Sequence, residues 1–567
     1  MTDWKAETDS YRKAQWYLVF VAMGVYLAFL IQVHLFPDPR AASQLSKQYH
    51  QSERMAMDRG SIYDSNGEPL ALSVTTYSVF LDPGVENFDP KSLDKMAKFI
   101  GKQKTDAIRK KLDRRFYWVK RYMEREEAEE IVRTCGKGFY IREERKRIYP
   151  KGSQLSHILG YCDQDGWGLA GVELTWNGAL VVPEKLHITY RGASSSAEIG
   201  GESADRTPAA QEHGLEQGLY LTIDSDIQYA LERFLGAQAA EYKVPWAAAV
   251  CLETKTGAVK AMASYPTFDS NNRATFSNLK ALSNNAVNRV YEPGSTFKPV
   301  MVAMALEQGR LRQGDSFRCP AYLKVADGVI RDSHPRDNGI MNVSQILIKS
   351  SNVGMAHIGM RMPPVTTYME MRSWGIGKRT GIRLNGEEPG LLPTADRWYG
   401  ITPANVAIGQ GFALTPLQLA TAFNAIINDG VLVRPYLVRS AVNSEGLQVF
   451  HSEPMEVDRV GSQKNARWIR SVLRKVVTEG TGKPAESSAV HVGGKTGTAQ
   501  VARKGKYVKG LYNSSFIGFW PANDPKYTML IVFGDVTGKV YYGGALAAPV
   551  FKQVVDEVER LKGIGVK

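Results

Sequence analysis

The sequence predicts an α+β protein with an N-terminal membrane helix, then a mixed α/β domain, and then a larger domain in which one antiparallel sheet packs against helices. Three observations support this prediction. The 567 residues are too many for a single hydrophobic core. A continuous apolar run lies close to the N-terminus. Beyond residue 218, strand-like segments at both ends enclose a mostly helical middle, which is typical of one sheet closed by distant parts of a domain.

The apolar run covers residues 17–36, and only Gln32 and His34 interrupt it with markedly polar side chains. A helix of this length spans about 30 Å, the thickness of the hydrocarbon core of a bilayer. A cleaved signal peptide is the competing interpretation, but residues 41–43 (Ala-Ala-Ser) fit a cleavage site poorly. We therefore expect an uncleaved transmembrane helix at residues 17–36, with residues 1–16 as a cytoplasmic tail and the bulk of the chain outside.

Residues 43–216 form the expected mixed α/β domain. Asn66-Gly67 predicts a turn between two strands, and residues 75–82 have the alternation of another strand. Residues 91–116 and 124–135 are helix candidates within a basic stretch. A solvated helical face is the simplest interpretation of these charges, and contact with an anionic glycan or lipid headgroups is the alternative.

The net charge of +13 is compatible with binding to nucleic acid, to an anionic membrane or to an anionic polymer such as cell wall. The sequence has no recognition-helix pattern and no aromatic–basic RNA motif, so nucleic acid is not expected. The nine histidines include no closely spaced pair on one helical face, so no metal site is expected. Four scattered cysteines are compatible with any of three disulfide pairings or with buried thiols: Cys135, Cys162, Cys251 and Cys319.

Residues 218–567 form the larger domain. A strand at residues 219–223 leads into a helix at 224–240, and residues 247–252 and 258–264 read as a hairpin. Helices dominate residues 295–428. Three late strands and a closing helix are expected at residues 490–492, 515–520, 527–534 and 547–562. We expect the chemistry where the edge of the sheet meets the helices.

Ser295 and Lys298 are the first candidate catalytic pair. Residues three apart share one face of a helix, so these two side chains can meet. Pro293-Gly294 predicts the turn that starts this helix, whose first N–H groups favour developing negative charge. A serine beside an amine and such donors suits acyl transfer. Taken alone, the pair is equally compatible with a capping serine and a solvated lysine.

Two further motifs follow in order, Ser350-Ser351-Asn352 and Lys495-Thr496-Gly497-Thr498. The second lies in an expected edge strand, where glycine lets another backbone approach closely, as an extended peptide substrate requires. Lys495 supplies a cation, and the hydroxyls of Thr496 and Thr498 supply donors. Three motifs in this order argue against a chance match.

Ser-x-x-Lys, Ser-x-Asn and Lys-Thr-Gly form the motif set of penicillin-binding proteins and serine β-lactamases. The chain resembles a class B penicillin-binding protein, and most of all the monofunctional transpeptidase of bacterial cell division. Supporting stretches run almost from end to end: Arg59 to Gly67, Lys146 to Gly152, Gly171-Val172-Glu173, Leu221 to Asp224, Tyr291 to Pro299, Gly409-Gln410-Gly411, Thr415 to Ala420 and Glu479 to Gly482. Ser65 departs from the arginine that many relatives carry there.

The resemblance implies a fold and a role for each motif. Residues 43–216 would be an elongated pedestal domain of dimerisation type, and residues 218–567 a penicillin-binding/serine β-lactamase-like transpeptidase domain. Ser295 would be the nucleophile and Lys298 its general base, whose pKa must fall by about three units. Burial and the nearby Lys495 would both lower it. The remaining roles would be proton relay by Ser350, positioning of Lys298 by Asn352, an oxyanion hole from the N–H groups of Ser295 and Thr498, and carboxylate binding at Thr496, Gly497 and Thr498.

The activity implied is that of a peptidoglycan D,D-transpeptidase without a cofactor, which cross-links stem peptides during septal wall synthesis and is acylated by β-lactams. Implied partners are the lipid-linked precursor, a membrane-embedded glycan polymerase and other division proteins. The implied location is the inner membrane at the division site. Alternatives are an elongation or sporulation transpeptidase, a β-lactamase or D,D-carboxypeptidase with water as acceptor, and a catalytically silent scaffold or β-lactam sensor.

Overall fold

The computed structural model describes residues 59–181, 187–192, 195–200 and 217–563, except for the single positions 115, 327, 444 and 504, and also Val21, Met23 and Gly24. Its contacts divide the chain into two units, Met1–Met55 with Pro183–Pro208 and Ala56–Val182 with Ala209–Lys567. In the first unit, β5 (His187–Gly192) and β6 (Ser195–Gly200) form an antiparallel hairpin. All other elements named below belong to the second unit.

The predicted membrane helix and cytoplasmic tail fall outside the described residues, apart from Val21, Met23 and Gly24, which are helical. None of the helices in the described part of the chain combines the length and the apolar character that crossing a bilayer requires. The anchor at residues 17–36 therefore stays a prediction.

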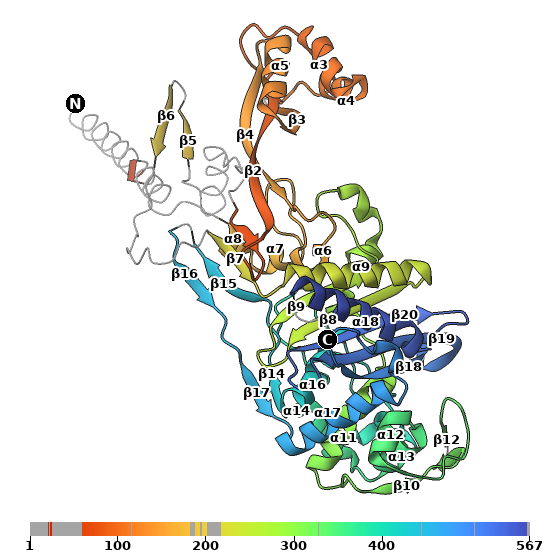
Figure 1. Cartoon of the computed structure of the whole chain (residues 1–567). Coiled ribbons are helices and arrows are strands. Elements are labelled where there is room, and N and C mark those ends of the chain that lie inside the picture. Colours follow the sequence, from red (N-terminus) through yellow and green to blue (C-terminus); the bar gives the residue numbers. More distant parts are fainter. Residues whose placement is uncertain are drawn as a thin grey trace, which may run out of the picture. The chain divides into compact units, whose positions relative to one another are not determined.

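The N-terminal part of the second unit is built on a three-stranded antiparallel sheet. β2 (Pro69–Leu81) is the central strand, between β3 (Tyr117–Met123) and β4 (Phe139–Ile148). Alternate residues of β2, such as Val79 and Leu81, lie in a small core with the helices on one face of the sheet. These helices are α3 (Ser92–Ile100), α4 (Lys102–Arg109) and α5 (Arg125–Cys135), seen in orange in Figure 1.

Most of the predicted elements of this region are present. The turn at Asn66-Gly67 joins two antiparallel strands, residues 75–81 continue β2, and α5 matches the helix predicted at 124–135. The single helix predicted at residues 91–116 is wrong. Two shorter helices replace it, because Gly101 has a φ of 82° and ends the first one, and the second ends at Arg109.

A second sheet joins this region to the larger domain. β1 (Ser61–Tyr63) pairs antiparallel with the start of β2 and parallel with β7 (Gly218–Leu221). β7 in turn pairs with β15 (Val438–Val442), which is followed in the sheet by β16 (Gln448–His451). The strand predicted at 219–223 is therefore present as β7, but its partners lie outside the main sheet of the larger domain. Short connecting helices, α6 (Ser156–Leu159), α7 (Gly171–Thr175) and α8 (Asn177–Leu180), precede β7.

The larger domain contains the expected antiparallel sheet, with five strands in the order β18-β19-β20-β8-β9. The early hairpin of β8 (Trp246–Glu253) and β9 (Val259–Tyr265) joins the late strands β18 (Gly493–Arg503), β19 (Lys506–Trp520) and β20 (Tyr527–Val536). The two ends of the domain thus close one sheet, as the sequence predicted. β18 is an edge strand.

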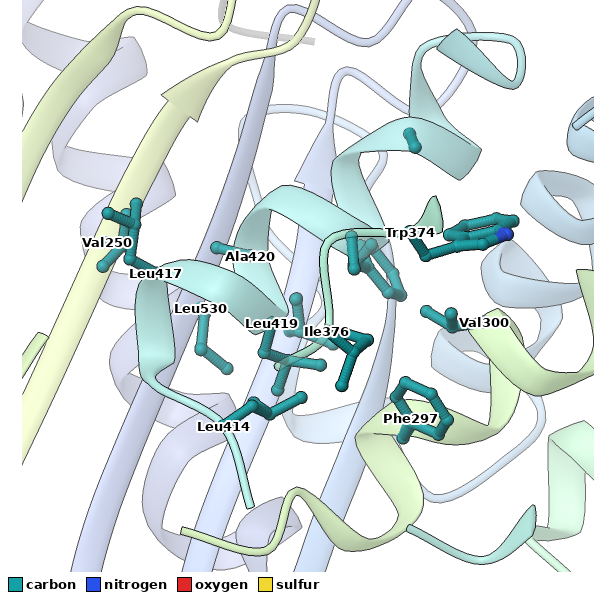
Figure 2. Packing of buried hydrophobic residues seen from close by; sticks show 14 of the residues in the cluster. Val250, Phe297, Val300, Trp374, Ile376, Leu414, Leu417, Leu419, Ala420 and Leu530 are labelled. Atoms are coloured by element: carbon teal, nitrogen blue, oxygen red, sulfur yellow. The ribbon is translucent and has the colours of Figure 1, made fainter. Parts of the chain in front are cut away.

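The two faces of this sheet belong to two separate cores. Along β8, Ala247, Ala249 and Cys251 pack with α9 (Ser225–Glu241) and α18 (Gly543–Leu561). Alternate residues of the same strand, including Val250, face the other side and pack with α16 (Pro416–Ile427). Figure 2 shows this second core, where Val250 and Leu530 of the sheet lie beside Leu417 and Ala420. The period of two along the strand explains how one short sheet supports both layers.

The helical part of the domain follows the prediction for residues 295–428 only in outline. It contains α10 (Asn285–Asn288), α11 (Lys298–Glu307), α12 (Val343–Lys349), α13 (Asn352–Met360), α14 (Pro364–Ser373), α15 (Thr402–Ala407), α16 and, later, α17 (Gln463–Thr478). Residues 316–342 differ from the prediction, because they form two small β-ribbons. β10 (Ser316–Arg318) pairs with β13 (Ile340–Asn342), and β11 (Tyr322–Val325) with β12 (Gly328–Arg331). One further ribbon joins β14 (Val431–Val433) to β17 (Glu456–Arg459).

The four cysteines are free and buried, so none of the three disulfide pairings forms. Burial raises the thiol pKa of all four, which keeps them protonated and unreactive at neutral pH.

A buried charge cluster holds the base of the N-terminal part together. Glu173 is completely buried between two arginines, with Oε2 at 2.5 Å from Arg59 Nε and Oε1 at 2.7 Å from Arg147 Nε. The hydroxyl of Tyr149 donates to the same carboxylate at 3.3 Å. Burial alone would raise the pKa of Glu173, but the two guanidinium groups outweigh it and hold the pKa below its ordinary value. Three segments that are distant in sequence therefore depend on one carboxylate.

We expect Glu173→Gln to destabilise the protein by about 3–5 kcal/mol, because it leaves two buried guanidinium groups without a counter-charge. Thermal unfolding of the full chain in detergent measures the effect. Glu129→Gln is the control, since its exposed partner Arg125 makes a pair worth about 0.5 kcal/mol. The Glu173 contribution should be present above the ordinary glutamate pKa and be lost as the pH falls through the lowered one. Equal losses in the two variants would contradict this account.

Candidate active site

Ser295 lies in a tight turn that precedes α11. The turn is a short 3₁₀ helix, Gly294–Phe297, and Ser295 within it is half-buried. The N–H of Gly294 donates to the carbonyl of Gly409 at 2.9 Å, and a Cβ on Gly409 would overlap Gly294. Within the described part of the chain, the Ser295 hydroxyl makes no hydrogen bond. The serine is thus presented with its hydroxyl uncommitted.

Lys298 is the first residue of α11 and is fully buried. Its Nζ donates at 2.7 Å to the carbonyl of Ser350 and at 2.7 Å to Oδ1 of Asn352. A longer contact of 3.4 Å reaches the Ser350 hydroxyl. Burial lowers the pKa of Lys298 to about 7, while the negative charge of Asp332 opposes the shift. Lys298 is therefore poised to exchange a proton near neutral pH.

The loop between α12 and α13 supplies these acceptors. Ser350 has a left-handed φ of 59°, which ends α12, and Ser351 caps α13 by accepting from the N–H of Gly354 at 3.0 Å. Asn352 Nδ2 donates to the carbonyl of Arg331 at 2.9 Å, which turns Oδ1 of the same amide toward Lys298. The loop geometry, and not only the residue types, aims these groups at the amine.

Asp332 fixes this loop from the small ribbon of residues 322–331. Its carboxylate accepts from the Ser351 hydroxyl at 3.1 Å and from the N–H groups of Asn352 at 2.5 Å and Val353 at 3.2 Å. It therefore binds the N-terminus of α13, where negative charge is favoured. Asp332 was not among the residues predicted from the sequence, since nothing in its neighbourhood marks a contact with a helix some 20 residues away.

Lys495 approaches from β18 and is also fully buried. Its Nζ donates to the Ser350 hydroxyl at 2.8 Å and to the carbonyl of Thr496 at 3.1 Å. Burial is the main reason that its pKa falls well below the ordinary value, and the positive charge of Lys298 adds to the effect. Ser350 Oγ therefore bridges two lysines and connects them as a path for a proton.

The rest of the Lys-Thr-Gly-Thr motif places the edge strand against the turn of Ser295. A Cβ on Gly497 would lie 2.5 Å from Ser515 Oγ and 2.9 Å from Thr296 Cγ2, so only glycine fits between them. Thr498 Oγ1 accepts from the N–H of Gly543 at 3.0 Å. Thr496 Oγ1 lies 2.6 Å from Thr481 Oγ1, and either hydroxyl can donate. Thr481 is a second residue that the analysis of motifs missed, although it lies in one of the stretches that carried the family resemblance.

The predicted site residues therefore meet in one place. Lys298, Ser350, Asn352 and Lys495 form a single hydrogen-bonded network, with Ser295 three residues before Lys298 and Gly497 packed against the same turn. Of the residues that the structure describes, no group of three or more His, Cys, Asp or Glu side chains could hold a metal ion. An uncommitted hydroxyl, an amine with a pKa near 7 and a bridging hydroxyl are the groups that acyl transfer through a serine needs.

Family models match both parts of the chain. Residues 247–556 match the penicillin binding protein transpeptidase domain, and residues 54–175 match the penicillin-binding protein dimerisation domain.

Full-length relatives give the same result. Stage V sporulation protein D of Bacillus subtilis is 30% identical and covers 97% of this chain and 86% of its own length. The probable peptidoglycan D,D-transpeptidase PenA of Neisseria gonorrhoeae is 30% identical, with 96% and 92% covered. Peptidoglycan D,D-transpeptidase FtsI of Escherichia coli is 29% identical, with 90% and 85% covered.

Solved structures of penicillin binding protein 3 from Mycobacterium tuberculosis have the same fold. The apo form aligns with a TM-score of 0.67 at 27% identity and covers 90% of this chain and 98% of its own. The same protein has been solved in complex with aztreonam. With a transpeptidase domain matched over more than half of its length and a dimerisation domain before it, this chain belongs to the class B penicillin-binding proteins.

Proposed function

We propose that this protein cross-links peptidoglycan as a D,D-transpeptidase, with Ser295 forming the acyl-enzyme. The observation that carries this proposal is the network in which Lys298, with a pKa near 7, shares the Ser350 hydroxyl with Lys495 beside an uncommitted serine. Relatives named as peptidoglycan D,D-transpeptidases support the choice of substrate. The donor would be a stem peptide ending in D-Ala-D-Ala.

The first step is attack of Ser295 Oγ on the carbonyl of the penultimate D-Ala. In its neutral form Lys298 has two N–H groups, and its two short hydrogen bonds at 2.7 Å use both. The lone pair is then free to accept the Ser295 proton. The C–N bond to the terminal D-Ala breaks, and the amine leaves with a proton delivered along Lys298, Ser350 and Lys495.

The edge strand β18 would hold the donor peptide. Its open side can add an extended peptide as a further strand, and the N–H groups of Ser295 and Thr498 would bind the oxyanion. Thr496 and Thr498 would bind the terminal carboxylate together with the cation of Lys495. The amine of a second stem peptide then attacks the acyl-enzyme and forms the cross-link. A β-lactam would occupy the same strand and acylate Ser295, as the aztreonam and ampicillin complexes of the mycobacterial relative suggest for that protein.

The location and timing of this activity are also proposals. We infer that residues 17–36 anchor the chain in the cytoplasmic membrane with the catalytic domain outside, since the apolar run is long enough and the substrate is extracytoplasmic. We place the protein at the division septum, with a membrane-embedded glycan polymerase and other division proteins as partners. The similarity to FtsI supports division, and that to stage V sporulation protein D supports sporulation as the alternative.

Ser295→Ala is expected to abolish covalent labelling by a fluorescent penicillin, because the acyl bond forms on that hydroxyl. The side chain is small and half-buried, so the thermal unfolding midpoint should stay within a few degrees of the wild type. Gel fluorescence after labelling is the measurement. Ser351→Ala is the control, since this neighbouring serine caps a helix and should retain labelling. Labelling that persists in Ser295→Ala would exclude it as the nucleophile.

The rate of penicillin acylation should fall as the pH drops below about 7, because protonated Lys298 cannot accept the Ser295 proton. The loss should be roughly tenfold per pH unit below that point. Asp332→Asn removes the charge that raises the pKa of Lys298, so the acidic limb should move to lower pH.

The matched control for this pH profile is Asp337→Asn, an exposed carboxylate of the same segment that pairs with Arg318. Its acidic limb should coincide with that of the wild type. An acidic limb that stays in place in Asp332→Asn would contradict the electrostatic link between Asp332 and Lys298.

Depletion of the protein in its source cell is expected to produce filaments, because septal cross-linking would stop while elongation continued. Full-length protein should restore division, and a chain without residues 17–36 should not, since the catalytic domain would lose its anchor. Phase-contrast microscopy measures cell length. Spherical cells would indicate elongation instead, and normal vegetative division with defective spores would indicate sporulation.

A further inference from the structure

A second hollow lies in the larger domain, apart from the residues of the catalytic network. Its volume is about 650 Å³, which falls within the usual range for small-molecule sites. Its walls come from α17, the C-terminal end of α16, the turn between β8 and β9 and the turn between β19 and β20. None of the predicted catalytic or substrate-binding residues lines it.

Three arginines of one helix face give the hollow its character. Arg467, Arg470 and Arg474 are spaced three and four residues apart on α17, so they share a face. Together with Lys255 they place four cations in the lining, against the two carboxylates of Asp429 and Asp524. The excess of positive charge in an enclosed volume favours an anionic ligand.

Arg470 is the best-placed of these cations. Its side chain is only 14% exposed, and Nη1 is held at 2.7 Å by the carbonyl of Ile427 and at 2.6 Å by Asp429. Among the described residues, its Nε and Nη2 groups have no protein partner, and they are not sealed from solvent. A guanidinium fixed on one side and unbonded on the other is suited to bidentate binding of a phosphate or carboxylate.

The same helix is connected to the catalytic strand at two points. Arg474 Nη1 donates at 2.9 Å to the carbonyl of Val492, the residue before β18 begins. Thr481, three residues after α17 ends, shares a hydrogen bond with Thr496 of the Lys-Thr-Gly-Thr motif. A shift of α17 that tightens its arginines on a ligand would therefore move both ends of the segment that precedes the catalytic lysine.

We propose that this hollow, which we call the α17 pocket, binds a small molecule carrying phosphate or carboxylate groups and that its occupancy changes the rate at which Ser295 is acylated. The arginines of α17 would hold the anion, and the contacts of Arg474 and Thr481 would transmit the change to β18. The site lies beyond the proposed transpeptidase reaction, which needs no residue of this pocket.

The test uses the full chain in detergent with two probes, inorganic phosphate and glutarate, at an ionic strength matched with chloride. Isothermal titration calorimetry should show saturable binding of one equivalent, and the tighter probe identifies the class of anion. The acylation rate with a fluorescent penicillin should change at least twofold with the same midpoint. Absence of saturable binding by both probes would overturn the site, and binding without a change in rate would overturn the regulatory role.

Three variants separate a built site from general attraction to a basic protein. Arg467→Gln should weaken binding at least fivefold, and Ser471→Trp should abolish it by filling the pocket while keeping every charge. Lys475→Gln makes the same change of charge at an exposed position of α17 outside the lining, and it should bind as the wild type does. Equal weakening in Arg467→Gln and Lys475→Gln, or unchanged binding in Ser471→Trp, would show non-specific attraction and overturn the proposal. Labelling of Ser295 without any probe should stay normal in all three, which distinguishes this outcome from failure of the transpeptidase reaction itself.

Discussion

The burial of two lysines side by side is the constraint on which the catalytic domain depends. Removing an ammonium group from water costs several kcal/mol even after the protein relaxes, and both Lys298 and Lys495 are fully buried. The cost falls if the amines lose protons, and this loss is also what turns Lys298 into a base. The surrounding structure offsets the remainder. Asn352 and the Ser350 carbonyl accept the N–H groups, and behind them α16 is buried along its whole length from Pro416 to Ile427. Figure 2 shows how closely Phe297 and Val300, which flank the catalytic lysine, pack into this core.

The base of the N-terminal part and the catalytic domain share structural elements at three places. β1 and β7 pair in one sheet, Gly171 donates its N–H to Asn385 at 2.7 Å, and Leu155 donates its N–H to Glu232 at 2.9 Å. Glu232 is buried, which raises its pKa to about 7, so its charge changes near neutral pH at a point of contact between the two regions. The Arg59–Glu173–Arg147 cluster lies in the same base. The two regions are thus joined by backbone pairing and buried polar contacts, not by a flexible linker alone.

Local patterns in the sequence predicted the strands and motifs, and contacts between distant segments escaped them. The Lys-Thr-Gly-Thr strand, the closing sheet and the residues Ser295, Lys298, Ser350 and Asn352 are each marked by their immediate neighbours. Asp332 and Thr481 act on loops far away in sequence, so no local signal identifies them. The ribbons at residues 316–342 have strands of three or four residues, too short for periodicity to show. The expectation of one helix face for Ser295 and Lys298 was also too simple. Ser295 lies in a 3₁₀ turn and Lys298 begins the α-helix, so the serine hydroxyl is not held by the amine.

The close contact of Gly294, Gly409 and Gly497 limits how this protein can evolve under antibiotic pressure. An inhibitor that imitates the donor peptide reads the backbone of β18, and the same backbone binds the substrate. At Gly409 and Gly497 even a methyl group would collide with the turn that carries the nucleophile or with its neighbours. Direct exclusion of the drug at these positions would therefore disable the enzyme as well. Tolerated changes must come from residues around the cleft, where they can alter the rate of acylation without entering the space between strand and turn.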